Sequence, residues 1–548
     1  MLLSSLARAF VLPRSVAFTS TLLPYARAAT VVRHASTMPS SAVETATSTM
    51  PAYKTLLSKL ETITQLERVK AVLSYDQLVF MPQHASADRG SQMSALAALI
   101  HEKKTDRALK ETMDAAAREL KDSDDTDAKR LLELELKELE ENERVTSELA
   151  AKVASLGSSA YSAWVEAKTN DDFASFAPVL EDCFQTSMEV SAAKRGEKGI
   201  SLYTQMLDQY ETGMSQARID EIFAEIRTAL VPLIARVLAS NDKPSTDPLH
   251  GSFDIDTQKA LCEDIVTKMG YDKLAGRIDV SVHPFTTSFS PNDVRITSRY
   301  RTDEWYQGMA AMIHESGHAM YEQNLGNSAT SIDSALSMGT HESQSLFWER
   351  HVGLGLPFWT WATPLLKDKF PEKFADSSPE QIYGAVNAVC PNLIRVEADE
   401  LTYPLHVILR YGIEKDVIGG NLEVKDIPNR WKQDMKSMLG VEVPSDAKGC
   451  LQDIHWASLA FGYFPTYLIG SATAAQLAHY CRQDLPMDEM IARGEFTEIK
   501  KWLKTKIHCH GKRYNSLDSL LEDQLGEALN PKYFIDYLQE KYTILYGL

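Results

Sequence analysis

Residues 312–325, MIHESGHAMYEQNL, contain two histidines four positions apart and a glutamate directly after the first. Side chains at positions i and i+4 of an α-helix project from one face, so His314 and His318 can bind a single metal ion. Glu315 then lies beside the ion and is not a ligand. In this HExxH arrangement a metal polarises a water molecule and the substrate carbonyl, while the glutamate takes the proton of the water. The stretch therefore predicts a hydrolytic metal site.

A chain with 14 histidines in 548 residues contains HExxH by chance in roughly a few per cent of cases, so the motif alone does not establish a metal site. A third ligand is needed. Glu342 lies about 28 residues after His314, in the stretch HESQSLFWER, where we expect the next helix. Two neutral imidazoles and one carboxylate leave zinc with an open position for water, which is the ligand set of catalytic sites. His341 is an alternative third ligand, and an ordinary carboxylate on a helix surface is the other interpretation of Glu342.

A single helix must hold the two histidines and Glu315. Thr302 can cap this helix, Asp303 and Glu304 fall in its first turn, and residues 324–326 can end it. The metal motif then lies in the middle of the helix, where the backbone is rigid.

Two strand-like segments precede this helix. Residues 277–285 and 294–300 alternate polar and apolar side chains around a turn at residues 290–293. Helical periodicity dominates from about residue 53 to 199, and again from residue 303 to the C-terminus. We therefore predict a mainly α-helical fold with one small β-sheet beside the metal-binding helix.

The composition is that of a large globular protein, with 44% hydrophobic and 24% charged residues. No linker separates independent cores, so we predict a single catalytic domain over residues 51–548. The net charge of −18 argues against a nucleic-acid partner, and the absence of a run of about 18 apolar residues argues against a membrane-spanning helix. The cysteines lack CxxC spacing, which indicates a reducing compartment. His508, Cys509 and His510 are adjacent and point apart, so we expect no metal site there.

The N-terminus differs from the rest of the chain. Residues 1–43 contain no Asp or Glu, and four arginines lie there among many Ser, Thr and Ala. This composition is typical of a transit peptide. We therefore interpret residues 1–50 as a transit peptide and disordered leader, with the mitochondrion or the chloroplast as the destination. A secretory signal and an untargeted tail are the alternatives, and a cytoplasmic location follows from the untargeted tail.

Several other segments accompany the metal motif. They are HESGH (314–318), HESQ (341–344), HPF (283–285), the DxRxT pattern of Asp293, Arg295 and Thr297, IRVEAD (394–399) and GCLQDIHW (449–456), with the weaker SYDQLVFMP (74–82) and LDQYETGM (207–214). Together these segments resemble the carboxypeptidase Taq family of metallocarboxypeptidases over about residues 55–545. Tyr75 departs from the family pattern, in which we expect tryptophan.

The resemblance implies a mostly helical fold with a deep active-site groove, a divalent metal that is zinc and that cobalt can replace, and homodimers. It also implies stepwise removal of C-terminal amino acids from peptides with broad specificity. Glu315 is then the general base toward the metal-activated water. A metallo-oligopeptidase that cleaves internally in short peptides is the alternative enzyme. A non-catalytic peptide-binding scaffold that retains the metal site is the alternative from another class of protein.

A carboxypeptidase must recognise the terminal carboxylate of its substrate, and a planar guanidinium can bind that group with two hydrogen bonds. Arg395 in IRVEAD is the first candidate, and Arg295 and Arg350 are alternatives. A structural ion pair is the other interpretation of each arginine. His283, at the end of a predicted strand, is a candidate for lining the groove and contacting the substrate.

The remaining candidates support the reaction at the metal. His455 and Tyr463 resemble positions near the active site of the family, and each can donate a hydrogen bond to the oxyanion that peptide hydrolysis creates. Tyr463 can instead contact the substrate carboxylate or pack in the core. Asp399 can hold a ligating histidine through its second ring nitrogen, as metal sites commonly require. Asp293 and Arg295 can pair across the hairpin.

Overall fold

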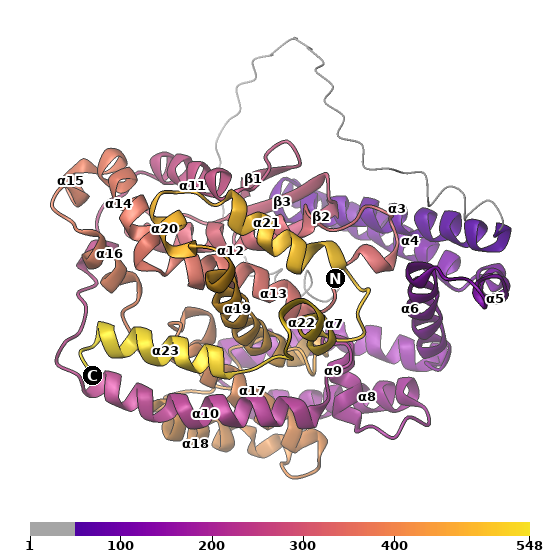
Figure 1. Ribbon diagram of the computed structural model, residues 1–548. Helices are drawn as coiled ribbons and strands as arrows, with labels where there is room; N and C mark the ends of the chain where they lie inside the picture. The colour runs from indigo at the N-terminus through magenta and orange to yellow at the C-terminus, as the bar shows by residue number, and fades with distance from the viewer. Residues whose placement is uncertain (1–49) are drawn as a thin grey trace, which may run out of the picture.

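The structure, a computed structural model, describes residues 50–548 and is mainly α-helical (Figure 1). The first group of helices, labelled as in Figure 1, comprises α3 (Pro51–Val79), α4 (Ser86–Lys104), α5 (Arg107–Leu120), α6 (Thr126–Glu143), α7 (Ser147–Asn170), α8 (Phe173–Arg195), α9 (Leu202–Asp208), α10 (Gln216–Ala239) and α11 (Ile255–Met269). The second group comprises α12 (Tyr306–Glu322), α13 (Met338–Leu346), α14 (Leu356–Lys369), α15 (Pro371–Phe374), α16 (Pro379–Val386), α17 (Tyr403–Ile418), α18 (Ile427–Leu439), α19 (Pro465–Asp484), α20 (Met487–Ala492), α21 (Thr497–Lys506), α22 (Leu517–Leu525) and α23 (Lys532–Leu545). The predicted transit peptide falls on residues 1–49, outside the described residues.

Helices α3, α5 and α6 pack around a small core of their own. Leu109, Met113, Ala116 and Leu120 recur with helical periodicity on one face of α5, and all four are buried. They meet buried side chains of α3 and α6. This N-terminal group of helices lies at one side of the molecule, on the right in Figure 1.

Three short strands form the sheet, namely β1 (Gly276–Val280), β2 (Thr286–Ser290) and β3 (Asp293–Ser298), in the order β1-β3-β2. β1 runs parallel to β3, and β2 forms the predicted hairpin with β3 around residues 290–293. The prediction of one strand over residues 277–285 is wrong, because the chain leaves the strand conformation after Val280 and β2 begins only at Thr286. Pro284, in this break, has no N–H to contribute to a ladder.

Helix α12 carries the HExxH motif in its middle, as the sequence predicts, but it begins later than expected. Its first residue is Tyr306, so Thr302 lies too far upstream to cap it. The side chain of Glu304 takes this role by accepting hydrogen bonds from the N–H groups of Tyr306 (2.7 Å) and Gln307 (3.0 Å). A carboxylate at this end also interacts favourably with the helix dipole.

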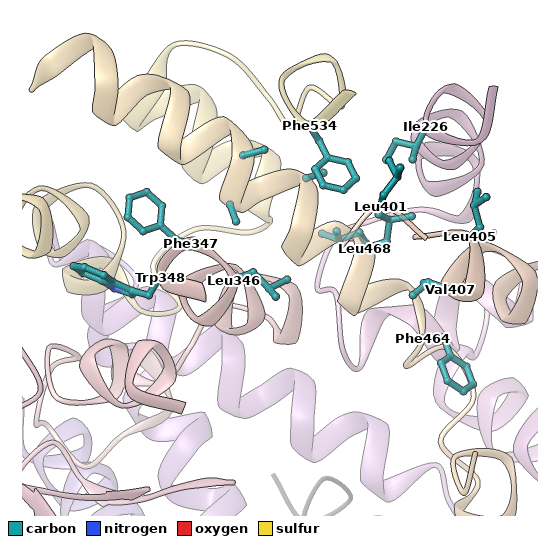
Figure 2. Close-up of a cluster of buried hydrophobic side chains, with 14 of the residues drawn as sticks. Ile226, Leu346, Phe347, Trp348, Leu401, Leu405, Val407, Phe464, Leu468 and Phe534 are labelled. Atoms are coloured by element: carbon teal, nitrogen blue, oxygen red, sulfur yellow. The ribbon is translucent and has the colours of Figure 1, made fainter. Parts of the chain in front are cut away.

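The main hydrophobic core surrounds α13 and α19, the two helices that follow and support α12. Figure 2 shows how the core is assembled from elements far apart in the sequence. Its labelled side chains come from α10 (Ile226), α13 and the π-helix Phe347–Gly353 after it (Leu346, Phe347, Trp348), the segment 401–407 (Leu401, Leu405, Val407), the start of α19 (Phe464, Leu468) and α23 (Phe534). None of the helices within residues 50–548 is both long and apolar enough to cross a membrane.

Candidate metal centre and active site

The structure brings His314, His318 and Glu342 together. The two histidines project from α12 and Glu342 projects from α13, as the sequence predicts. Glu342 Oε2 lies 3.3 Å from His318 Nε2 and 4.0 Å from His314 Nε2, and one ligand atom of each residue lies within 4.8 Å of the others. Ligand atoms of a tetrahedral zinc ion are about 3.3–3.6 Å apart. The donor set therefore suits a divalent metal, with the Glu342–His318 pair at this spacing and the Glu342–His314 pair at a wider one. No other such group occurs within residues 50–548.

Glycines allow the helices around this site to approach closely. A Cβ atom on Gly317, inside the HESGH motif, would lie 2.6 Å from the carbonyl oxygen of Gln344 on α13. A Cβ atom on Gly470 of α19 would lie 2.8 Å from Cβ of Glu342. Helix α13 is thus held between α12 and α19 with no room for a further methyl group on either side, and its position fixes that of Glu342.

Both histidines are oriented through their second ring nitrogen. His314 Nδ1 donates to Glu349 Oε2 (2.5 Å), and His318 Nδ1 donates to the carbonyl oxygen of His341 (3.1 Å). Burial would raise the pKa of Glu349, but the hydrogen bond from His314 holds it below its usual value. These contacts leave each Nε2 directed at Glu342 and keep the imidazoles in the tautomer that binds a metal.

The prediction that Asp399 holds a ligating histidine is wrong, because Glu349 and the His341 carbonyl occupy both Nδ1 atoms. Asp399 instead accepts hydrogen bonds from the N–H groups of Leu401 (3.0 Å) and Thr402 (2.9 Å) before α17. Glu349 lies seven residues after Glu342, in the π-helix Phe347–Gly353 that continues α13. The sequence did not indicate Glu349, because α-helical periodicity does not predict where a π-helix directs its side chains.

His341 does not point its ring nitrogens at the metal ligands. Its Nε2 donates to Glu322 Oε1 (3.0 Å), and its ring stacks on that of His318 at 4.4 Å. Glu342 is therefore the better third ligand. His508 is also engaged elsewhere, because its Nε2 donates to Gln344 Oε1 (2.9 Å).

Glu315 lies beside the metal ligands and is 4% exposed. Thr286, the first residue of β2, donates its hydroxyl hydrogen bond to Glu315 Oε2 (2.7 Å) and also lies 2.9 Å from the carbonyl oxygen of Glu315. The edge strand of the sheet therefore fixes the orientation of this carboxylate. The sequence predicts a sheet beside this helix but does not indicate that Thr286 contacts Glu315.

Arg395 is 5% exposed and forms an ion pair. Its Nη2 donates to Asp453 Oδ1 (2.9 Å) and its Nη1 donates to the hydroxyl of Tyr403 (3.1 Å). Arg410 donates to the other oxygen of Asp453 (2.6 Å). Burial would raise the pKa of Asp453, but the charges of Arg410 and Arg395 hold it well below its usual value. Two guanidinium groups thus share one carboxylate, and the cluster carries a net positive charge.

Comparisons with known proteins agree with this arrangement. The profile of the carboxypeptidase Taq (M32) metallopeptidase family matches residues 55–542. The chain belongs to this family. Carboxypeptidase 1 of Bacillus subtilis is 39% identical over 90% of this chain and 99% of its own length. The crystal structure of the M32 carboxypeptidase from Deinococcus radiodurans superimposes with a TM-score of 0.87 at 34% identity, covering 91% of this chain and all of that one. Metallocarboxypeptidase 1 of Trypanosoma cruzi gives a TM-score of 0.85 at 33% identity, covering 90% and 99%.

The other candidate arginines of this metallocarboxypeptidase are also engaged. Arg295 pairs with Asp293 through two contacts of 2.8 Å, but both residues lie on β3, so the predicted pairing across the hairpin is wrong. Arg350 is buried, donates to Ser471 Oγ (2.9 Å) and lies over the ring of Tyr403 at 5.2 Å.

His455 and Tyr463 lie near Arg395. The ring of Tyr467 contacts all three, at 4.8 Å from the guanidinium of Arg395, 5.4 Å from the ring of Tyr463 and 6.1 Å from that of His455. His455 Nε2 also lies 3.2 Å from the hydroxyl of Tyr467. The structure thus gathers three of the predicted residues in one cluster. His283 is exposed in the loop between β1 and β2.

Proposed function

We propose that this metallocarboxypeptidase releases C-terminal amino acids from peptides with broad specificity, using zinc bound by His314, His318 and Glu342. The observation that carries the proposal is the pairing of the three metal-binding side chains with a buried, hydroxyl-anchored Glu315 in one HExxH helix. Zinc, which cobalt can replace, supplies a Lewis acid that polarises the scissile carbonyl and makes water a better nucleophile.

Glu315 acts as the general base and then as the general acid. It takes the proton of the attacking water and returns it to the leaving amine, and proton transfer of this kind contributes about 10²–10⁴-fold in rate. The hydrogen bond from Thr286 to Oε2 supports this role, since it holds one oxygen and leaves the other, Oε1, to accept the proton.

Arg395 binds the terminal carboxylate of the substrate. The net positive charge of the Arg395–Asp453–Arg410 cluster supports this assignment, because a single carboxylate does not neutralise two guanidinium groups. Asp453, through Nε and Nη2, and Tyr403, through Nη1, orient the guanidinium. Arg350 and Arg295 remain alternatives, with His283 as a further contact to the substrate.

His455 and Tyr463 donate hydrogen bonds to the oxyanion that forms at the scissile carbonyl. Their location around Tyr467, next to Arg395, supports this role, because the scissile bond lies one residue from the terminal carboxylate. A donor of this kind contributes about 10²–10³-fold to kcat.

Residues 51–548 act as one catalytic domain. The main core extends from α7 to α23, and hydrogen bonds from Tyr75 of α3 to Asp279 (2.5 Å) and from Arg130 of α6 to the carbonyl oxygen of Lys512 (3.0 Å) join the N-terminal helices to it. We propose a homodimer and an N-terminal transit peptide that directs the chain to the mitochondrion or chloroplast. Sedimentation of the purified chain tests the first point. Import of the full-length chain, compared with a variant lacking residues 1–50, tests the second.

The proposed reaction is tested with a set of short peptides whose C-termini are free or amidated. Mass spectrometry should detect sequential loss of C-terminal residues from the free peptides alone, and a chelator should abolish the loss. Internal cleavage of the amidated peptides would identify a metallo-oligopeptidase instead. Absence of any cleavage by the metal-loaded chain would indicate a peptide-binding scaffold.

A further inference from the structure

Glu211 is a buried acid in the segment LDQYETGM, which has no part in the proposed reaction. It lies in the turn after α9 and is 1% exposed. Its carboxylate interacts with the N–H of Gly339 and the hydroxyl of Ser337, and burial raises its pKa to about 8. Burial of an acid without a cation costs folding free energy. The contacts of Glu211 with α13 must therefore contribute something that offsets this cost.

The N-terminal turn of α13 depends on this segment. The first N–H groups of a helix have no partner within the helix. Met338 N donates to the carbonyl oxygen of Tyr210 (2.9 Å), and Gly339 N donates to Glu211 Oε1 (2.5 Å). The hydroxyl oxygen of Ser337, the N-cap residue, accepts a hydrogen bond from a third N–H group, that of Thr340 (3.0 Å). A helix as short as α13 is not stable by its own hydrogen bonds, so its position depends on these partners.

The carboxyl group of Glu211 also fills the space beneath this turn. A Cβ atom on Gly339 would lie 2.6 Å from Glu211 Oε1 and 2.9 Å from Ile469 Cγ2 of α19. Glu342 follows Gly339 by three residues, which is less than one helical turn. Removal of the carboxyl group would leave a cavity into which the first turn can move, and Glu342 would move with it.

We propose that Glu211 is a positioning residue that sets the metal affinity of the site by fixing α13, and with it Glu342, against α12. It acts through the main chain of Gly339 and touches neither the metal ligands nor the substrate. Metal–ligand distances lie within about 0.2 Å of standard values, so we expect a shift of α13 after loss of the hydrogen bond at its base to weaken metal binding. This inference rests on the proposed metal site.

The test is the zinc dissociation constant of full-length variants, measured by competition with a chromophoric chelator. Glu211→Ala should bind zinc about 10–100-fold more weakly, the range seen when a supporting residue of a metal ligand is removed. Glu211→Gln keeps an oxygen that can accept from Gly339 N and should stay within about threefold of the unchanged chain. Glu211→Asp, which is shorter by one methylene group, should resemble the alanine variant and serves if the alanine variant does not fold.

Glu400 offers a matched control, because it is a buried acid whose hydrogen bonds go to Lys541 (2.6 Å) and Tyr537 (3.0 Å) of α23. Glu400→Gln should lower the melting temperature and leave the zinc dissociation constant unchanged. Zinc affinity within twofold of the unchanged chain in Glu211→Ala or Glu211→Asp, or a glutamine variant as weak as the alanine variant, would overturn the inference. Failure of the unchanged chain to bind zinc, or full zinc affinity in Glu342→Ala, would instead refute the proposed metal site.

Discussion

Gly317→Ala tests whether the close contact between α12 and α13 sets the geometry of the metal site. The new Cβ atom would lie 2.6 Å from both the carbonyl oxygen of Gln344 and Cα of Ser345. Both are main-chain atoms, so α13 must move away by about 0.8 Å to restore ordinary contact. Overpacking of this kind costs about 1–3 kcal/mol of unfolding free energy.

The same movement displaces Glu342 from the histidines of α12. Its Oε2 lies 3.3 Å from His318 Nε2, close to the spacing that zinc requires. A shift of about 0.8 Å is larger than the range of about 0.2 Å within which metal–ligand distances normally fall. We therefore expect Gly317→Ala to weaken zinc binding at least about tenfold, to lower the melting temperature and to lower kcat at limiting zinc.

The assay combines the zinc dissociation constant with melting temperatures measured with and without zinc. Gly157→Ala is the control, because Gly157 also lies inside a helix, α7, but its Cβ atom would be 3.9 Å from Leu459 Cδ1 and meets no clash. That variant should be as stable as the unchanged chain or more stable by about 0.5–1 kcal/mol. Unchanged zinc affinity and melting temperature in Gly317→Ala would refute the argument that this contact positions Glu342.

Three further predictions concern the polar groups of the site. Glu315→Gln should bind zinc normally and lose at least about 10²-fold in kcat; near-normal turnover on a free-ended peptide would exclude Glu315 as the base. Glu349→Ala should raise the zinc dissociation constant about 10–100-fold because His314 loses its orienting carboxylate, whereas equal affinity in equilibrium dialysis would contradict that role. Asp453 has a lowered pKa, so its contribution to stability is complete above its unfolded pKa of about 3.9 and is lost as pH falls through the lower folded pKa. Denaturant unfolding should therefore find Asp453→Asn less stable by about 3–5 kcal/mol near pH 7 and by progressively less below about pH 4, and a deficit that does not shrink in acid would disprove the linkage.

The proximity of the three candidate metal ligands could be predicted because their relation is mostly local. His314 and His318 share a helix face through the i, i+4 spacing, and Glu342 follows on the next α-helix. The end of α12 and the β2–β3 hairpin depend on nearby residues and were predicted for the same reason. The start of α12 was not, because Thr302 and Glu304 are both good cap residues and only the tertiary path of the chain decides between them.

The partners of the site residues could not be predicted with the same success. Glu349 and Asp399 are both acids near recognised segments, and nothing in the sequence states which one reaches His314 Nδ1. The choice depends on how α13 and the π-helix after it pack against α12. That packing requires contacts between distant parts of the chain. The glycines at 317 and 470 allow that packing, but a sequence does not reveal which backbone each glycine approaches.

If Arg395 binds the terminal carboxylate, its cluster explains how an acidic protein attracts that group. The net charge of the chain is −18, so the protein as a whole repels the anionic end of a peptide. Charges further away than about 8 Å are largely screened at physiological salt, and the local balance of two arginines against Asp453 then decides the field that the terminal carboxylate meets. If Arg395 is the anchor, Asp453 has two opposing effects, since it fixes the guanidinium and also cancels part of its charge. Under this proposal Arg410 contributes to recognition without contacting the substrate, because it restores the positive balance.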